Sequence, residues 1–285
     1  MSFDLFFYVG GATAPQSWDR LSAWADEQRH FHRRVAAGGG FELFYENPAT
    51  GVYFSIIQAD PPPPNAATQH LAPASLAFNL NFMRARFFAI EAAEIVADLA
   101  TRLELLVYDP QRGEVGRPTA AQLVDSWCRG NHAGVLAMRA MGQALPFMAA
   151  QNADAFWRYC FDLARVKKTL GKDVFVPELV AVRRGDVALR LAILLKPTQY
   201  VMPPADLFYI DRNGALLAVR ADHVHAALGS LCKPARELPG VSLITESVLF
   251  RAGVMDAWDR FYETVPVECP VNQLERLKTD GFVDL

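Results

Sequence analysis

The chain has 285 residues, with 28 lysines and arginines, 31 aspartates and glutamates and a formal net charge of -3. Hydrophobic residues make up 52% of it and charged residues 21%, which excludes an intrinsically disordered chain. The basic residues are scattered along the sequence and form no stripe. This argues against a nucleic-acid-binding protein, whose affinity depends largely on neutralising phosphates.

The start of the chain, its apolar stretches and its cysteines indicate the cellular compartment of the protein. The first ten residues are apolar but contain Asp4 and no preceding basic residue, so they do not resemble a signal peptide. No stretch reaches the ~18 apolar residues that a membrane helix needs. Cys128, Cys160, Cys232 and Cys269 form no C-x-x-C pair and have no histidine at zinc-ligand spacing. We therefore expect a cytoplasmic protein with buried free thiols, no membrane contact, no metal and no cofactor.

Strand and helix patterns alternate at the start of the chain. Residues 3–9 are a short apolar run typical of a buried strand. An apolar stripe at helical spacing from Ser17 to Val35 predicts a helix that ends at glycines 38–40. Residues 41–46 and 52–57 predict a hairpin, because Asn, Pro and Gly lie between them. The proline-rich residues 60–65 predict a stiff connector, with a proline-rich ligand for a partner as the alternative.

A period-2 alternation follows the connector. Phe78, Leu80 and Phe82 alternate with polar residues, which predicts a strand with one face in the core. Residues 88–103 repeat apolar side chains at helical spacing, and residues 105–108 predict another strand. The order of elements becomes β-α-β-β-β-α-β. This order indicates an antiparallel sheet with both helices on one face.

The uncovered face of this sheet is the candidate binding face. If the helices cover Phe78 and Leu80, the polar side chains of the same strand point to the other side. They join polar residues of the hairpin there, and two arginines follow the strand. A convergence of these residues would make a polar pocket for a small anion or an acidic side chain of a partner, and the alternative is a solvated sheet edge. The candidate residues are Glu46, Asn79, Asn81, Arg84 and Arg86, with Glu42 and Ser55 nearby.

The second half predicts helices followed by hairpins. Residues 112–118 are rich in Gly, Pro and charge and indicate a domain boundary, with an α+β sheet domain at 1–112 and a second domain at 113–285. Thr119 caps a helix that Gly130 and Asn131 interrupt, and another helix ends at Gly171. Two hairpins at 179–195 and 207–219 predict an antiparallel sheet, followed by a helix at 221–228, a strand at 241–250, a helix at 255–264 and an irregular tail. The expected fold class is α+β.

Motifs of catalysis are weak throughout the sequence. Residues 10–15 lie where a phosphate loop would, but they lack a Gly-Lys-Ser/Thr sequence and contain Pro15. The pairs His30/His32 and His223/His225 are two residues apart, so from a helix neither pair can ligate one metal, although from a strand either could. There is no G-x-S-x-G. The carboxylate pairs Asp206/Asp211 and Glu91/Glu94 are interpreted as turn residues and as solvated helix charge.

These observations favour a non-catalytic binding or interaction protein, of an immunity or adaptor type, that binds a protein partner or associates with itself. The alternative is a hydrolase or transferase whose catalytic residues come from distant parts of the chain and leave no local motif. A homodimer with a structural role is the third hypothesis.

Overall fold

The computed structural model describes residues 1–10, 18–35, 40–196, 198–235 and 241–284. The protein has an α+β fold, and its contacts divide it into two compact units, Met1–Ala144 and Leu145–Leu285. This division lies later in the chain than residue 112, where the sequence predicts it. The reason is that helix α3 (Ala120–Ala140) packs against helix α2 (Phe87–Arg102) and so belongs to the first unit.

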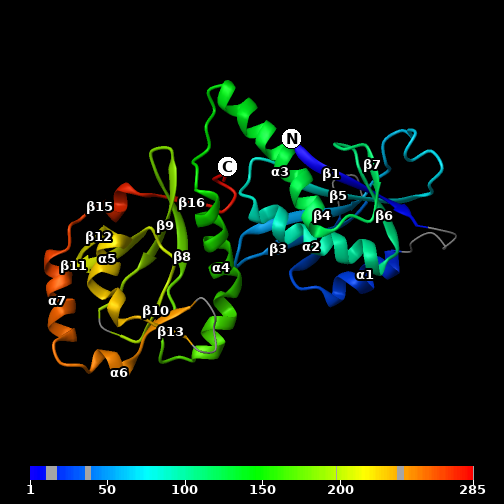
Figure 1. Cartoon of the computed structure of the whole chain (residues 1–285). Coiled ribbons are helices and arrows are strands. Elements are labelled where there is room, and N and C mark those ends of the chain that lie inside the picture. The colour runs from blue at the N-terminus through cyan, green and yellow to red at the C-terminus, as the bar shows by residue number, and fades with distance from the viewer. Residues whose placement is uncertain (11–17, 36–39, 197, 236–240, 285) are drawn as a thin grey trace. The chain divides into compact units, whose positions relative to one another are not determined.

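The first unit contains a seven-stranded sheet in the order β2-β3-β4-β5-β1-β6-β7, with antiparallel neighbours throughout (Figure 1). The predicted hairpin, the alternating strand and the second helix are confirmed as β3, β4, β5 and α2. The strands are β1 (Ser2–Val9), β2 (Phe31–Val35), β3 (Phe41–Asn47), β4 (Val52–Gln58), β5 (Pro73–Asn81), β6 (Leu105–Asp109) and β7 (Glu114–Gly116).

One face of this sheet holds the core of the unit. Phe3 and Leu5 of β1 lie opposite Leu80 and Phe78 of β5, and all four are buried. Helix α2 covers this face, and helix α1 (Trp18–Glu27) lies beside it, where Trp24 Nε1 donates a hydrogen bond to Asp98 of α2 at 2.8 Å. Both helices therefore cover one face, as the sequence predicts.

The first helix is shorter than the sequence predicts, and β2 takes up the rest of the segment. The chain turns at His30, whose φ is 72°, and Phe31 then pairs with Tyr45 of β3. The ring of Phe31 still packs on Trp24, at 5.4 Å between centroids. Phe31 therefore makes the contact with Trp24 that its spacing predicts, but it does so from a strand and not from a helix. Some residues with predicted roles lie outside the described residues. They are the expected cap Ser17, the glycines 38 and 39 at the expected end of the helix, and most of the phosphate-loop candidate 10–15.

Helix α3 is continuous through Gly130 and Asn131, so the predicted interruption is wrong. Both residues lie against the loop that follows β5. Asn131 Oδ1 accepts hydrogen bonds from the backbone N–H of Met83 at 2.5 Å and of Arg84 at 3.4 Å, which holds Met83 at a φ of 61°. A Cβ on Gly130 would lie 2.4 Å from the ring of Phe82. The glycine is needed for this close approach.

We expect Gly130→Ala to lower the free energy of unfolding of the first unit by about 1 to 3 kcal/mol, because the ring of Phe82 must move. Gly134 is the matched control in the same helix. A Cβ there would meet its nearest atom, Met1 Cε, at 3.5 Å, an ordinary contact. Gly134→Ala should therefore stabilise by up to about 1 kcal/mol through helix propensity. Urea denaturation of both variants measures the difference, and equal shifts would contradict the assigned role of Gly130.

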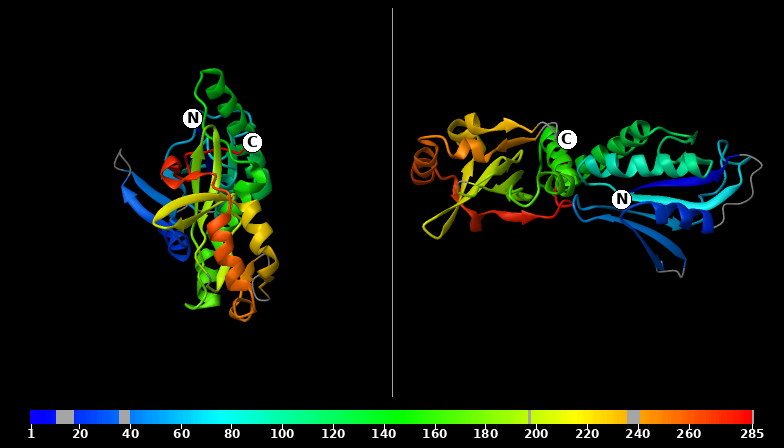
Figure 2. Two further views of the ribbon diagram at one scale, coloured as in Figure 1. Left: turned by 90° about the vertical axis from the view of Figure 1, so that its left-hand side faces the viewer. Right: turned by 90° about the horizontal axis from the view of Figure 1, so that it is seen from below.

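The second unit contains a six-stranded sheet in the order β15-β12-β11-β9-β8-β16 and a small sheet in the order β10-β14-β13 (Figure 2). The two predicted hairpins are confirmed as β8–β9 and β11–β12, but β9 and β11 pair in parallel. The strands are β8 (Leu179–Arg184), β9 (Val187–Ile193), β10 (Tyr200–Met202), β11 (Leu207–Arg212), β12 (Ala215–Arg220), β13 (Lys233–Pro234), β14 (Ser242–Ile244), β15 (Cys269–Pro270) and β16 (Glu275–Leu277).

Helices of the second unit supply buried side chains to its core. Phe156 of α4, Val224 of α5 and Trp258 of α7 are fully or nearly fully buried. The helices are α4 (Ala150–Leu170), α5 (Ala221–Leu228), α6 (Glu246–Leu249) and α7 (Val254–Thr264), with short 3-10 turns η1 (Gly229–Leu231) and η2 (Val271–Gln273). Among the described helices of the whole chain, none combines the length and the apolar character needed to cross a membrane.

The strand expected within 241–250 is confirmed as the short β14, and the rest of the segment contains the helical turn α6. The expectation of an irregular tail is wrong. The tail is regular, because β15 pairs with β12 and β16 pairs with β8. The tail therefore completes both edges of the six-stranded sheet.

The cysteines are all free thiols. Cys160 is buried, as expected, whereas Cys128, Cys232 and Cys269 are partly exposed.

Candidate functional site

The predicted binding residues on the strands do lie on the uncovered face of the first sheet. The register pairs Asn79 with Ser55 of β4 and with Asp4 of β1, while Asn81 lies opposite Ser2. Asn79 Nδ2 donates to Asp4 Oδ1 at 2.6 Å, and Asn81 is exposed. Glu46 is exposed on β3 and lies 3.9 Å from Arg34. The register thus supports the predicted face, and its role in binding stays a prediction.

Arg84 and Arg86 come from the turn between β5 and α2. The guanidinium of Arg84 donates to the hydroxyl of Tyr53 and to the carbonyl of Met83, each at 3.0 Å. Arg86 is the N-cap residue of α2 and is partly buried. Arg84 therefore contacts β4 through Tyr53.

An aromatic and cationic row that sequence reasoning missed lies on the same face. Arg34 stands 3.5 Å above the ring of Phe44, and that ring stacks on Tyr53 at 6.3 Å between centroids. The signal in the sequence is weak, because the three residues belong to different strands. Other side chains of the protein therefore already contact the faces of these rings.

Glu91 is not solvated charge, as the sequence predicts, but a buried acceptor that is 6% exposed. Its carboxylate accepts hydrogen bonds from the Tyr45 hydroxyl and the Asn47 amide, both at 2.7 Å, and from the Thr50 hydroxyl at 2.9 Å. Burial, with the nearby Glu91 charge as the second cause, raises the pKa of Tyr45 well above its usual value. The cluster ties α2 to the hairpin β3–β4, a structural role.

Histidines offer no metal site in the described part of the chain. His32 lies on β2 and His30 in the turn before it, while His223 and His225 lie in α5. No group of three His, Cys, Asp or Glu side chains among the described residues could hold a metal ion.

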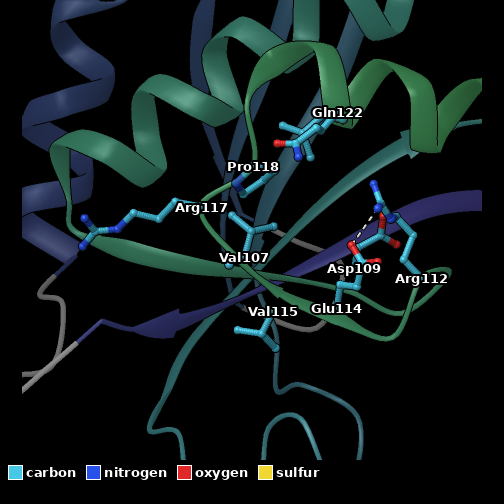
Figure 3. Close-up of a pocket in the computed structure, with 10 residues that line it drawn as sticks. Val107, Asp109, Arg112, Glu114, Val115, Arg117, Pro118 and Gln122 are labelled. Atoms are coloured by element: carbon cyan, nitrogen blue, oxygen red, sulfur yellow. Dashed lines mark ion pairs between the residues drawn. The ribbon is translucent and has the colours of Figure 1, made fainter.

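A small cavity of about 220 Å³ lies between the β6–β7 hairpin and the start of α3 (Figure 3). Four of its five charged or amide side chains, all except Arg117, already have partners among the described residues. Buried Asp109 accepts hydrogen bonds from Ser126 and from the backbone N–H of Gln111, and Arg112 pairs with Glu114 at 2.8 Å. Gln122 completes the capping box with Thr119 that the sequence predicts in part. We therefore attribute the cavity to the junction between the hairpin and the helix.

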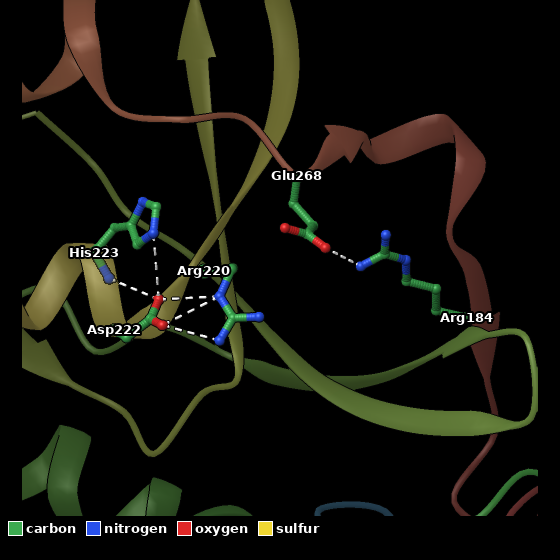
Figure 4. A network of polar contacts seen from close by, with 5 residues as sticks. All are labelled: Arg184, Arg220, Asp222, His223 and Glu268. Carbon is green, nitrogen blue, oxygen red and sulfur yellow. Dashed lines mark hydrogen bonds and ion pairs between the residues drawn. The ribbon is translucent and has the colours of Figure 1, made fainter.

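A second polar cluster, on the surface of the second unit, consists of exposed ion pairs (Figure 4). Arg220 donates to Asp222 at 2.9 Å and Arg184 pairs with Glu268. Each arginine lowers the pKa of its carboxyl partner by hydrogen bonding. Exposed pairs of this kind contribute little to stability.

The larger candidate site is an apolar face of the six-stranded sheet in the second unit. Val180 of β8, Leu191 of β9 and Leu207 of β11 are neighbours in the register, so their side chains point to one side. The residues one position on, including Ala192 and Phe208, point to the other side and are buried. On the first side Val180, Leu189, Tyr209 and Leu274 are only partly buried, and they surround the buried Val182, Leu191 and Leu207.

Two adjoining cavities follow this face, and together we call them the sheet groove. One has a volume of about 580 Å³ and the other about 560 Å³, and they share Ile193, Tyr209 and Leu216. Ten of the thirteen residues around the larger cavity are apolar or aromatic. Its charged residues are Lys167, Glu178 and Arg276, and those of the smaller cavity are Lys196 and Asp211.

Burial strongly raises the pKa values of several tyrosines and of one cysteine among the described residues. Burial raises the pKa of the Cys160 thiol to about 12, so the thiol is neutral and a poor nucleophile near pH 7. Burial likewise raises the pKa of Tyr262 at the edge of the smaller cavity, and its hydroxyl donates to the carbonyl of Leu194. Neither group is activated for catalysis.

Comparisons of the chain with protein-family models, with curated proteins and with solved structures found no match. The function must therefore be inferred from the geometry of the site itself.

Proposed function

We propose that the protein is a non-catalytic binding protein of the cytoplasm, and that the sheet groove of the second unit holds a small molecule with an apolar body. The observation that carries this proposal is the combination of volume and lining. Small-molecule sites are concave, measure about 300 to 1,000 Å³ and have mostly apolar walls with a few polar groups. The larger cavity, about 580 Å³ with three charged residues among thirteen, has this character.

An open apolar sheet face is unusual for a protein surface unless something covers it. One face of an antiparallel sheet commonly meets water, and that face is then polar. Here the exposed face carries Val180, Ile193 and Leu216, with Leu216 50% exposed. A ligand that covers these side chains would gain the free energy of removing them from water.

The titration of a neutral apolar fluorophore, phenylnaphthylamine, tests this proposal. We expect a saturable rise in fluorescence with one site per chain. Leu216→Glu should weaken binding by at least about tenfold, because the ligand would have to desolvate a carboxylate. Leu136→Glu is the matched control, since Leu136 is 49% exposed on α3 and lies outside the groove. Equal affinities of the two variants would contradict the proposed site.

An enzyme with a dispersed site is the alternative, as a hydrolase or a transferase. The described tyrosines and the cysteine with strongly raised pKa values, such as Tyr159 and Cys160, are buried groups that stay protonated near neutral pH. A protein partner or self-association, in the manner of an immunity or adaptor protein, is the other form of the binding proposal. It would use the polar face with Glu46, Asn79 and Asn81.

A further inference from the structure

We infer that the ligand of the sheet groove is an amphipathic anion, with its acidic group in the larger cavity, which Lys167 and Arg276 line. This inference rests on the proposed function and adds the chemical class of the ligand to it. It follows from the charges around the groove.

Several described arginines of the second unit, unlike these two cations, already have a carboxylate partner. Arg165, Arg184, Arg190 and Arg220 each pair with a carboxylate. Within the described part of the chain, neither Lys167 nor Arg276 takes part in an ion pair, and both are exposed. Arg276 lies opposite Val182 in the register, so it belongs to the groove side of β16. Cations that have no carboxylate partner beside an apolar surface are available to an anionic ligand.

Charge balance points the same way. The larger cavity has two cations and one carboxylate, Glu178, whereas the smaller cavity has one cation and one carboxylate, Lys196 and Asp211. The excess positive charge is therefore confined to the larger cavity. Between the two ends lie Ile193, Tyr209 and Leu216, which belong to both cavities. A ligand with an apolar body along this middle section and an acidic group in the larger cavity would match both parts of the groove.

Two dyes that differ by one sulfonate test the inference. Anilinonaphthalene sulfonate is phenylnaphthylamine with an added anionic group. We expect the intact chain to bind the anionic dye more tightly than the neutral one, with an advantage that shrinks as salt is added. The double variant Lys167→Gln, Arg276→Gln should weaken the anionic dye by about fivefold to tenfold and leave the neutral dye unchanged.

Matched variants separate a local effect from the effect of net charge. Lys168→Gln with Arg251→Gln removes the same charge from exposed residues of the second unit outside the groove, and should leave both affinities unchanged. Glu178→Gln should tighten the anionic dye by about twofold to fivefold. Equal binding of the two dyes by the intact chain, or equal losses in the two double variants, would overturn the anionic ligand while the apolar groove stands. Failure to bind either dye would overturn the proposed function itself.

Discussion

Replacing Asp206 by alanine is expected to lower the free energy of unfolding of the second unit by about 3 to 5 kcal/mol. Asp206 lies just before β11 and holds the guanidinium of Arg190 with two hydrogen bonds, at 2.9 Å to Nε and 2.6 Å to Nη2. The side chain of Arg190 is only 9% exposed. Without the carboxylate, the positive charge of Arg190 stays buried with no counter-charge, which strongly destabilises the folded state.

The opposite end of the same strand supplies the control. Asp211 is exposed and accepts one hydrogen bond, from the N–H of Gly214 in the hairpin turn. Asp211→Ala should cost about 0.5 to 1.5 kcal/mol. The double variant Arg190→Met, Asp206→Leu should recover most of the loss, because it removes both charges together. Urea denaturation measures all three, and an equal cost for Asp206→Ala and Asp211→Ala would contradict the role assigned to the ion pair.

Replacing Leu80 by alanine is expected to cost the first unit about 2 to 5 kcal/mol, as a truncation in a packed core. Leu80 is 2% exposed, lies opposite Phe3 and packs beneath α2 and α3 with Ala93 and Trp127. The space beside it is only about 10 Å³, so the removed atoms would leave a new cavity.

The neighbouring residue distinguishes the two faces of β5. Asn81 is exposed, and Asn81→Ala should cost less than about 1 kcal/mol. Thermal or urea unfolding of the two variants, compared at equal concentration, measures the difference. Equal costs would mean that the assigned faces of the strand are wrong.

Local patterns predict much of this fold, because they reflect interactions between near neighbours. The alternation of Phe78 and Leu80 with asparagines predicts both the strand and its buried face. Thr119 predicts the start of α3, since the cap and its partner Gln122 are three residues apart. The pair Asn213 and Gly214 predicts the turn between β11 and β12.

Features that depend on distant partners could not be read from such patterns. Glu91 looks like exposed helix charge until Tyr45, Asn47 and Thr50 reach it from the hairpin. Gly130 looks like a helix breaker until the ring of Phe82 fills the space beside it. In both cases the residue type is explained by a contact with a different element.

The sheet groove is another feature that the sequence conceals. Its walls require the parallel pairing of β9 with β11, and the pairing of β16 with β8, which brings Leu274 and Arg276 from the tail. Alternating patterns within each strand show that one side is apolar, but they do not show how much of that side stays exposed. The candidate face in the first unit was easier to predict because Asn79 and Asn81 mark it within one strand.

The most direct test of the central claim is to locate a bound ligand by methyl NMR. A titration of phenylnaphthylamine into methyl-labelled protein should shift the methyl signals of Val180, Leu191, Ile193, Leu216 and Leu274, which line the sheet groove. Signals of Val107, Val115 and Leu123, which line the small cavity of the first unit, should stay unchanged. Shifts confined to that small cavity, or no saturable shifts in the sheet groove, would contradict the account.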